Sequence, residues 1–130
     1  MEALWRRMTF NILISNTDDH LRNHGFLYTG AEGWRLSPAY DLNPVPTDIK
    51  PRILTTAINE DDGTASLALA MEVAGYFELD DEKARNIAAQ VGRAASRWRA
   101  EAGRHGLTQA EINRMASAFD HEDLKTALRR

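Results

Sequence analysis

The strongest constraint in this sequence is a set of apolar residues that recur at helical spacing in its second half. These residues are Ala84, Ile87, Ala88, Val91, Ala95 and Trp98. Steps of three and four positions place such side chains along one face of an α-helix, which must be buried against other elements. Asp80 can cap the start of this helix, and Gly103 and Gly106 are expected to end it.

Further helices are predicted across residues 65–130. One buried helix is indicated by Leu67, Leu69, Met71, Val73 and Phe77. Thr108 and Glu111 have the spacing of a capping box, so another helix should begin there. Its apolar face is formed by Ile112, Met115, Ala116 and Phe119. Asp120 is expected to cap a final short helix that runs to Leu128.

The first half of the chain has a different pattern. Apolar residues in positions 1–15 predict a helix, and no capping residue precedes it, as if the helix were entered from its middle. Residues 24–29 and 34–37 are two short strand candidates around a turn that contains Gly30 and Gly33, which predicts a β-hairpin. The predicted fold class is therefore mainly α with a small β-hairpin.

Composition limits the function classes. The chain has 130 residues, 43% hydrophobic and 27% charged, with a net charge of -3, which is typical of one soluble domain over residues 1–130. A mildly acidic chain is a poor non-specific binder of nucleic acid or anionic membranes. The absence of cysteine excludes disulfides, thiolate zinc sites and iron–sulfur clusters. We find no apolar segment long enough for a signal peptide or membrane helix, so we expect a cytoplasmic protein.

Oxygen ligands gather around the predicted hairpin. Asp18, Asp19 and Asn23 precede it and Asp41 follows it, so the hairpin can return Asp41 toward Asp18. Carboxylate and amide oxygens suit Mg²⁺ rather than zinc. Asn23 lies five positions after Asp18, as in the catalytic loop of protein kinases, where the Asp accepts the substrate proton and the Asn holds Mg²⁺. A second magnesium-binding Asp follows in kinases, and Asp41 stands in the corresponding place.

Other interpretations of these residues remain open. Asp18 and Asp19 could form an ordinary solvated turn. With His20 and Asp41 they could serve a metal-dependent phosphohydrolase, although two-metal hydrolases usually have more ligands at close spacing.

Surface interactions offer two more alternatives. The chain could be a non-catalytic interaction module with an exposed apolar patch made by Leu4, Trp5 and Met8. A basic stripe could contact DNA phosphates, although nearby acids favour a solvated helix face. The stripe consists of Arg93, Arg97, Arg99 and Arg104.

Two segments resemble the HipA-like kinases. Residues 10–25, FNILISNTDDHLRNHG, are similar to the catalytic loop of that family, and residues 34–42, WRLSPAYDL, look like its magnesium-binding segment. The spacing between the two segments also fits, and residues 67–77 are similar to the helical region that follows. The resemblance implies the C-terminal helical lobe of an atypical Ser/Thr protein kinase fold.

The resemblance also implies roles and partners. Asp18 would be the catalytic base, His20 would orient the loop, and Asn23 and Asp41 would bind Mg²⁺ and, through it, ATP. Arg22 stands where Lys is common in the family. Many HipA-like proteins are toxins paired with a HipB-like antitoxin, through which they meet DNA indirectly, and known substrates include aminoacyl-tRNA synthetases.

One part of a kinase has no counterpart in this sequence. The glycines form no clustered phosphate-binding loop, and Lys50, Lys83 and Lys125 all follow Asn23. We therefore expect catalytic and metal-binding loops with the hairpin in residues 1–64 and helices in 65–130, without the N-terminal lobe that clamps ATP. Such a chain should be inactive alone, and its exposed lobe surface could favour self-association.

Overall fold

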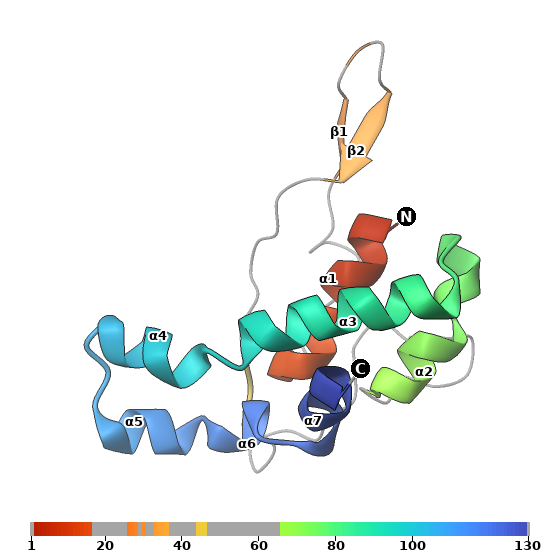
Figure 1. Ribbon diagram of the computed structural model, residues 1–130. Helices are drawn as coiled ribbons and strands as arrows, with labels where there is room; N and C mark the ends of the chain where they lie inside the picture. Colours follow the sequence, from red (N-terminus) through yellow and green to blue (C-terminus); the bar gives the residue numbers. More distant parts are fainter. Residues whose placement is uncertain are drawn as a thin grey trace.

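The computed structural model describes residues 2–16, 26–28, 30, 33–36, 44–46 and 66–129. In these ranges it contains seven α-helices, one 3-10 helix and two strands (Figure 1). The elements are α1 (Glu2–Ile14), β1 (Phe26–Tyr28), β2 (Trp34–Leu36), α2 (Leu67–Glu72), η3 (Ala74–Phe77), α3 (Asp81–Ala95), α4 (Trp98–Arg104), α5 (Gln109–Arg114), α6 (Ala116–Phe119) and α7 (Glu122–Arg129). The predicted class, mainly α with a small hairpin, is confirmed.

The core forms where α1 and α3 pack together, with α2 and α7 against them (Figure 1). From α1, the side chains of Trp5, Ile12 and Leu13 are fully buried. From α3, the predicted apolar face is buried as expected, including Ala84 and Ile87. Both long helices thus direct their apolar faces inward, as amphipathic helices must.

Trp5 links α1 to α2. Its indole Nε1–H donates a hydrogen bond of 2.9 Å to the carbonyl oxygen of Ala70, and its ring has no exposed surface. Leu4 and Met8 are half-buried, and Met8 packs against the core. The prediction that Leu4, Trp5 and Met8 form an exposed apolar patch is therefore wrong for Trp5, because α2 and η3 cover this side of α1.

Helix α3 begins as predicted and ends earlier than predicted. The Asp80 side chain accepts a hydrogen bond of 2.7 Å from the Lys83 backbone N–H. The helix stops at Ala95, where the Ser96 hydroxyl donates to the Arg93 carbonyl at 2.8 Å and competes with the helical pattern. A new helix, α4, starts at Trp98.

Packing explains why the chain turns between α3 and α4. The Trp98 ring stacks on Phe119 of α6, with ring centroids 4.4 Å apart and an interplanar angle of 8°.

Gly103 lies inside α4 rather than ending it, whereas Gly106, with φ +83°, follows the helix end as predicted.

The capping box of Thr108 and Glu111 is present and starts α5, as predicted. The predicted cap at Asp120 is wrong. Asp120 pairs with Arg99 of α4, and the His121 ring Nδ1 accepts the hydrogen bond from the Leu124 backbone N–H of α7 at 3.3 Å. Because α7 begins at Glu122, the capping position is His121, and Asp120 lies one position too early.

The predicted hairpin is also present. Strand β1 pairs antiparallel with β2, with Phe26 opposite Leu36 and Tyr28 opposite Trp34. Gly30 and Gly33 have φ of +71° and +80°, values that L side chains rarely adopt. The hairpin projects away from the helices (Figure 1).

Gly92 allows α3 and α7 to approach closely. A Cβ atom added at Gly92 would lie 3.1 Å from the Ala127 Cβ and 3.5 Å from Leu128 Cδ2. A larger side chain there would push the two helices apart, so the small residue sets their spacing.

Gly92→Leu should lower the free energy of unfolding by about 1–3 kcal/mol, because the added atoms overpack the contact between α3 and α7. Gly103→Ala is the matched control, since a Cβ there meets nothing within 4 Å. It should raise stability by about 0.5–1 kcal/mol through helix propensity. Urea denaturation followed by circular dichroism measures both, and parental stability of Gly92→Leu would contradict the packing assignment.

Candidate functional site

The predicted catalytic and metal-binding residues lie outside the described residues. These are Asp18, Asp19, His20, Arg22, Asn23 and Asp41. The described segments on either side of them are the C-terminal end of α1 and residues 44–46. These two segments set where the chain enters and leaves the candidate site.

Helix α1 ends in a Schellman motif, a reversal in which two backbone N–H groups bond back into the last turn. The Ser15 N–H donates to the Ile12 carbonyl at 3.3 Å, and the Asn16 N–H donates to the Asn11 carbonyl at 2.9 Å. Ser15 has φ +58°, the left-handed conformation that glycine usually occupies in this motif. A non-glycine residue in this conformation costs about 1–3 kcal/mol, which contacts with its surroundings must offset.

Two hydrogen bonds hold Ser15 in this conformation. Its hydroxyl donates to the Ala118 carbonyl of α6 at 2.7 Å, and its own carbonyl accepts from the Val45 N–H at 3.1 Å. The second bond joins the segment that precedes Asp18 to the segment that follows Asp41. The chain therefore returns to the end of α1 after the hairpin.

A buried amide pair lies beside this turn. The Asn16 Nδ2 donates to Asn11 Oδ1 at 3.0 Å, and both side chains are fully buried. Among the described residues, Asn16 Oδ1 and Asn11 Nδ2 have no hydrogen-bond partner. Buried polar atoms of this kind are costly to leave unpaired, so the end of α1 is a polar site within an apolar core.

His121 connects the end of α1 to the start of α7. Its ring Nε2 lies 2.8 Å from the Leu13 carbonyl oxygen, and its Nδ1 lies 3.3 Å from the Leu124 nitrogen. Since the Leu124 N–H can only donate, Nδ1 is the acceptor, and Nε2 carries the proton that it donates to Leu13. The sequence pattern did not single out Ser15 or His121, because neither belongs to a motif or an apolar face.

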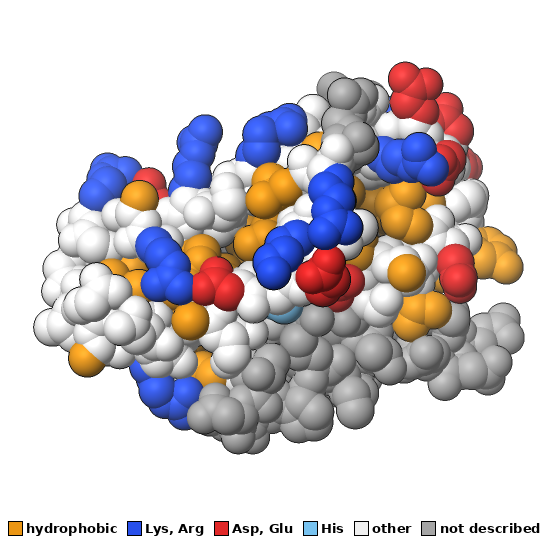
Figure 2. Space-filling view, turned by 60° about the horizontal axis from the view of Figure 1, so that its bottom comes forward, with side chains coloured by type: hydrophobic (Ala, Val, Ile, Leu, Met, Phe, Trp, Pro, Cys, Tyr) orange, Lys and Arg blue, Asp and Glu red, His pale blue; other side chains and the backbone are white. Residues whose placement is uncertain are grey.

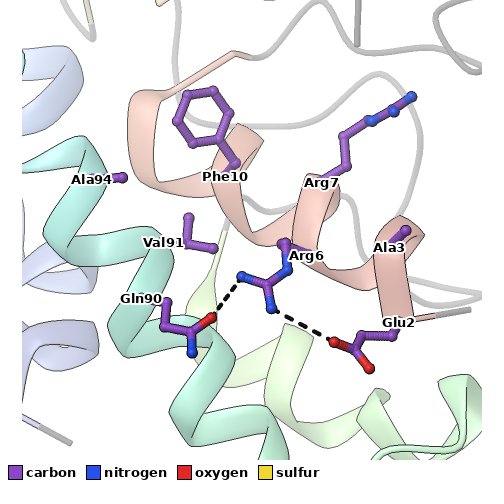
Figure 3. A pocket seen from close by; sticks show the side chains of 8 residues that line it. All are labelled: Glu2, Ala3, Arg6, Arg7, Phe10, Gln90, Val91 and Ala94. Atoms are coloured by element: carbon purple, nitrogen blue, oxygen red, sulfur yellow. Dashed lines mark hydrogen bonds and ion pairs between the residues drawn. The ribbon is translucent and has the colours of Figure 1, made fainter. Parts of the chain in front are cut away.

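A groove lies on the other half of α1, against α3 (Figure 3). It encloses about 700 Å³. Arg6 spans it, donating to Gln90 Oε1 at 2.9 Å and pairing with Glu2 at 3.6 Å. Glu2 and Arg6 thus pair with each other, and none of the lining residues is a His or a hydroxyl nucleophile.

The predicted magnesium ligands lie outside the described residues. Asp18, Asn23 and Asp41 offer the hard oxygen atoms that Mg²⁺ binds. Within the described ranges, no cluster of three or more His, Asp and Glu side chains could hold a metal. The described helices also include none with the length and apolarity needed to cross a membrane.

Comparison with known proteins identifies the family. The model of the HipA-like C-terminal domain matches residues 1–98. The chain belongs to the HipA-like C-terminal domain family. Neither the curated proteins nor the solved structures gave a match.

The match to the HipA-like C-terminal domain contains both segments that resemble the kinase loops. Its limit at residue 98 is also informative. Ala118 and His121, which bond to Ser15 and to the Leu13 carbonyl, both lie beyond it. The matched region therefore depends on α6 and α7 for contacts at the end of α1.

The arginines considered as a basic stripe do not share one helix, since Arg93 lies in α3, Arg97 precedes α4, and Arg99 and Arg104 lie in α4. Arg99 pairs with Asp120, and Arg104 lies 2.8 Å from Glu101. Figure 2 shows one face on which basic, acidic and hydrophobic side chains are interspersed. This arrangement favours the solvated surface over a DNA-binding stripe.

Two substitutions of Ser15 distinguish the contribution of its side-chain hydrogen bond to stability from the cost of its backbone conformation. Ser15→Ala should lower the free energy of unfolding by about 1–2 kcal/mol, because the Ala118 carbonyl loses its donor. Ser15→Gly loses the same bond but accepts φ +58° without strain, so it should be about 1 kcal/mol more stable than Ser15→Ala. Urea titration of both variants tests this order, and a Gly variant less stable than the Ala variant would contradict it.

The Glu2 carboxylate should contribute to stability only when it is ionised. Its hydrogen bond and charge interaction with Lys83, at 3.0 Å, and then its contact with Arg6, hold the pKa of Glu2 below its ordinary value of 4.5. A lowered folded pKa gives stability that is complete above pH 4.5 and is lost as the pH falls through the folded value.

Glu2→Gln should therefore melt slightly below the parent at pH 7 and together with it at pH 2–3. Glu72→Gln is the control, since Glu72 is exposed and has no ion pair with a described residue. Thermal melts across this pH range provide the measurement. A Glu2→Gln difference that persists at the acidic end would show that the ion pair is not its cause.

Proposed function

We propose that this HipA-like domain carries the catalytic and magnesium-binding loops of a Ser/Thr protein kinase. The observation that carries the proposal is the family match, because it spans Asp18, Asn23 and Asp41 at kinase spacing. The hydrogen bond between Val45 and Ser15 supports it, because it ties together the chain segments on either side of these residues.

Chain length limits how far apart the proposed residues can lie. An extended residue spans at most about 3.6 Å, so the Asp18 Cα lies within about 11 Å of the Ser15 Cα. By the same rule, the Asp41 Cα lies within about 14 Å of the Val45 Cα. Both limits are compatible with a single site beside the end of α1.

In the proposed reaction, the substrate hydroxyl oxygen bonds to the γ-phosphorus of ATP while the bond to the leaving oxygen of ADP breaks. The Asp18 carboxylate accepts the hydroxyl proton. Asn23 and Asp41 would hold Mg²⁺, which neutralises charge on the phosphates. His20 would orient the loop that carries Asp18.

We expect these 130 residues to bind ATP weakly by themselves. Phosphoryl transfer depends on positioning, and the sequence has neither a clustered-glycine loop nor a lysine ahead of Asp18 to hold the phosphates. A HipB-like antitoxin, an aminoacyl-tRNA synthetase substrate, a cytoplasmic location and self-association are part of the same proposal. The antitoxin and the substrate follow from the family resemblance. The location follows from the lack of an apolar segment long enough for a signal peptide or membrane helix, and self-association follows from the expected exposed lobe surface.

Mn²⁺, a paramagnetic substitute for Mg²⁺, tests the metal site directly. Electron paramagnetic resonance titration of the full chain should show one saturable site, and Asp41→Ala should remove it because a carboxylate ligand is lost. Glu72→Ala, on the exposed side of α2, should bind as the parent does. Absence of parental binding, or binding that Asp41→Ala leaves intact, would contradict the proposal.

Calorimetric titration with ATP and Mg²⁺ tests whether the chain binds ATP as weakly as we expect. Little heat and no measurable autophosphorylation are expected from the chain alone. Autophosphorylation that Asp18→Ala abolishes would support the kinase assignment and contradict the expected weakness. Phosphatase activity in the presence of Mn²⁺ would instead favour the phosphohydrolase alternative.

A further inference from the structure

The end of α1 is held by groups that come from far along the chain. Ser15 bonds to Ala118, and the Leu13 carbonyl meets the His121 ring, 108 positions away in sequence. Both partners lie beyond the region matched by the HipA-like domain. The junction between α6 and α7 therefore supports the point from which the candidate catalytic loop leaves α1.

His121 makes two different contacts there. Capping α7 requires only an acceptor for the Leu124 N–H, and Asn, Asp, Ser or Thr provide one more commonly than His. The second nitrogen reaches the Leu13 carbonyl, one of the last four of α1 that have no partner within the helix. A ring with two separated nitrogens can bridge these groups, whereas a short capping side chain cannot.

The bridge bears directly on the proposed site. Leu13 lies two residues before the left-handed Ser15 and five before Asp18. A strained turn keeps one conformation only while its surroundings hold it. Groups that hydrogen-bond to metal ligands commonly affect metal affinity. His121 would act one step further away, through the backbone of α1.

We propose that His121 is a positioning residue for the candidate phosphotransfer site. By bonding the Leu13 carbonyl, it holds the end of α1, from which the chain continues to Asp18 and Asn23. The proposal rests on the function proposed above, but its effect on the chain after Ser15 can be measured independently.

His121→Asn separates positioning from helix capping. The Asn side chain can still accept from the Leu124 N–H, so α7 stays capped, but it is too short to reach the Leu13 carbonyl as well. The matched control is His105→Asn. His105 is a surface residue with 78% of its side chain exposed, and its ring lies 4.0 Å from Glu101.

Two measurements on the full chain decide the proposal. Below the melting temperature of both variants, His121→Asn should weaken Mn²⁺ binding about 10-fold, while His105→Asn should bind within about twofold of the parent. Amide hydrogen exchange measured by NMR should also accelerate at Asn16 and residues 17–23 in His121→Asn, with α3 unchanged. A merely structural loss would lower the melting temperature without changing either property.

The outcomes distinguish this inference from the proposed function. If the parent binds Mn²⁺ and His121→Asn binds it equally well, the positioning role is overturned. If the parent binds no Mn²⁺, the kinase proposal fails and the exchange data decide the role of His121. In that case, faster exchange at residues 17–23 supports positioning of this segment, and unchanged exchange overturns it.

Discussion

The burial of α1 is the constraint on which the rest of the described structure depends. A helix packed against α2, η3, α3, α6 and α7 has little contact with solvent along its second half. Its terminal carbonyls still need donors, because a buried carbonyl without one is costly. The His121 ring donates to the Leu13 carbonyl, and the Schellman turn at Ser15 provides donors for the Asn11 and Ile12 carbonyls.

These polar contacts determine where the chain leaves α1 and where it returns to it. The core helices supply rigidity, while the hydrogen bonds at Ser15 fix where the chain leaves α1 and where it returns at Val45. Loops held on a rigid scaffold commonly carry function. The residues proposed for catalysis follow this end of α1 in the sequence.

Local signals in the sequence predicted most elements because they depend on neighbouring residues. The Asp80 cap, the Thr108 capping box and the hairpin around Gly30 each require groups only a few positions apart. The predictions were wrong where contacts between residues distant in the sequence determine the local structure. Trp98 stacks on Phe119 and the chain turns after Ala95, and Arg99 takes Asp120 as its partner while His121 caps α7.

The sequence by itself determined the helical class, the hairpin, the candidate loop chemistry and the resemblance to its family, because periodicity, turn residues and motif spacing are local properties. Only the tertiary structure decided that Trp5 is covered, that Ser15 takes the left-handed conformation, and that His121 supports α1. The reason is physical. A buried carbonyl or ring takes its partner from whatever element packs beside it, and sequence spacing does not encode that neighbour.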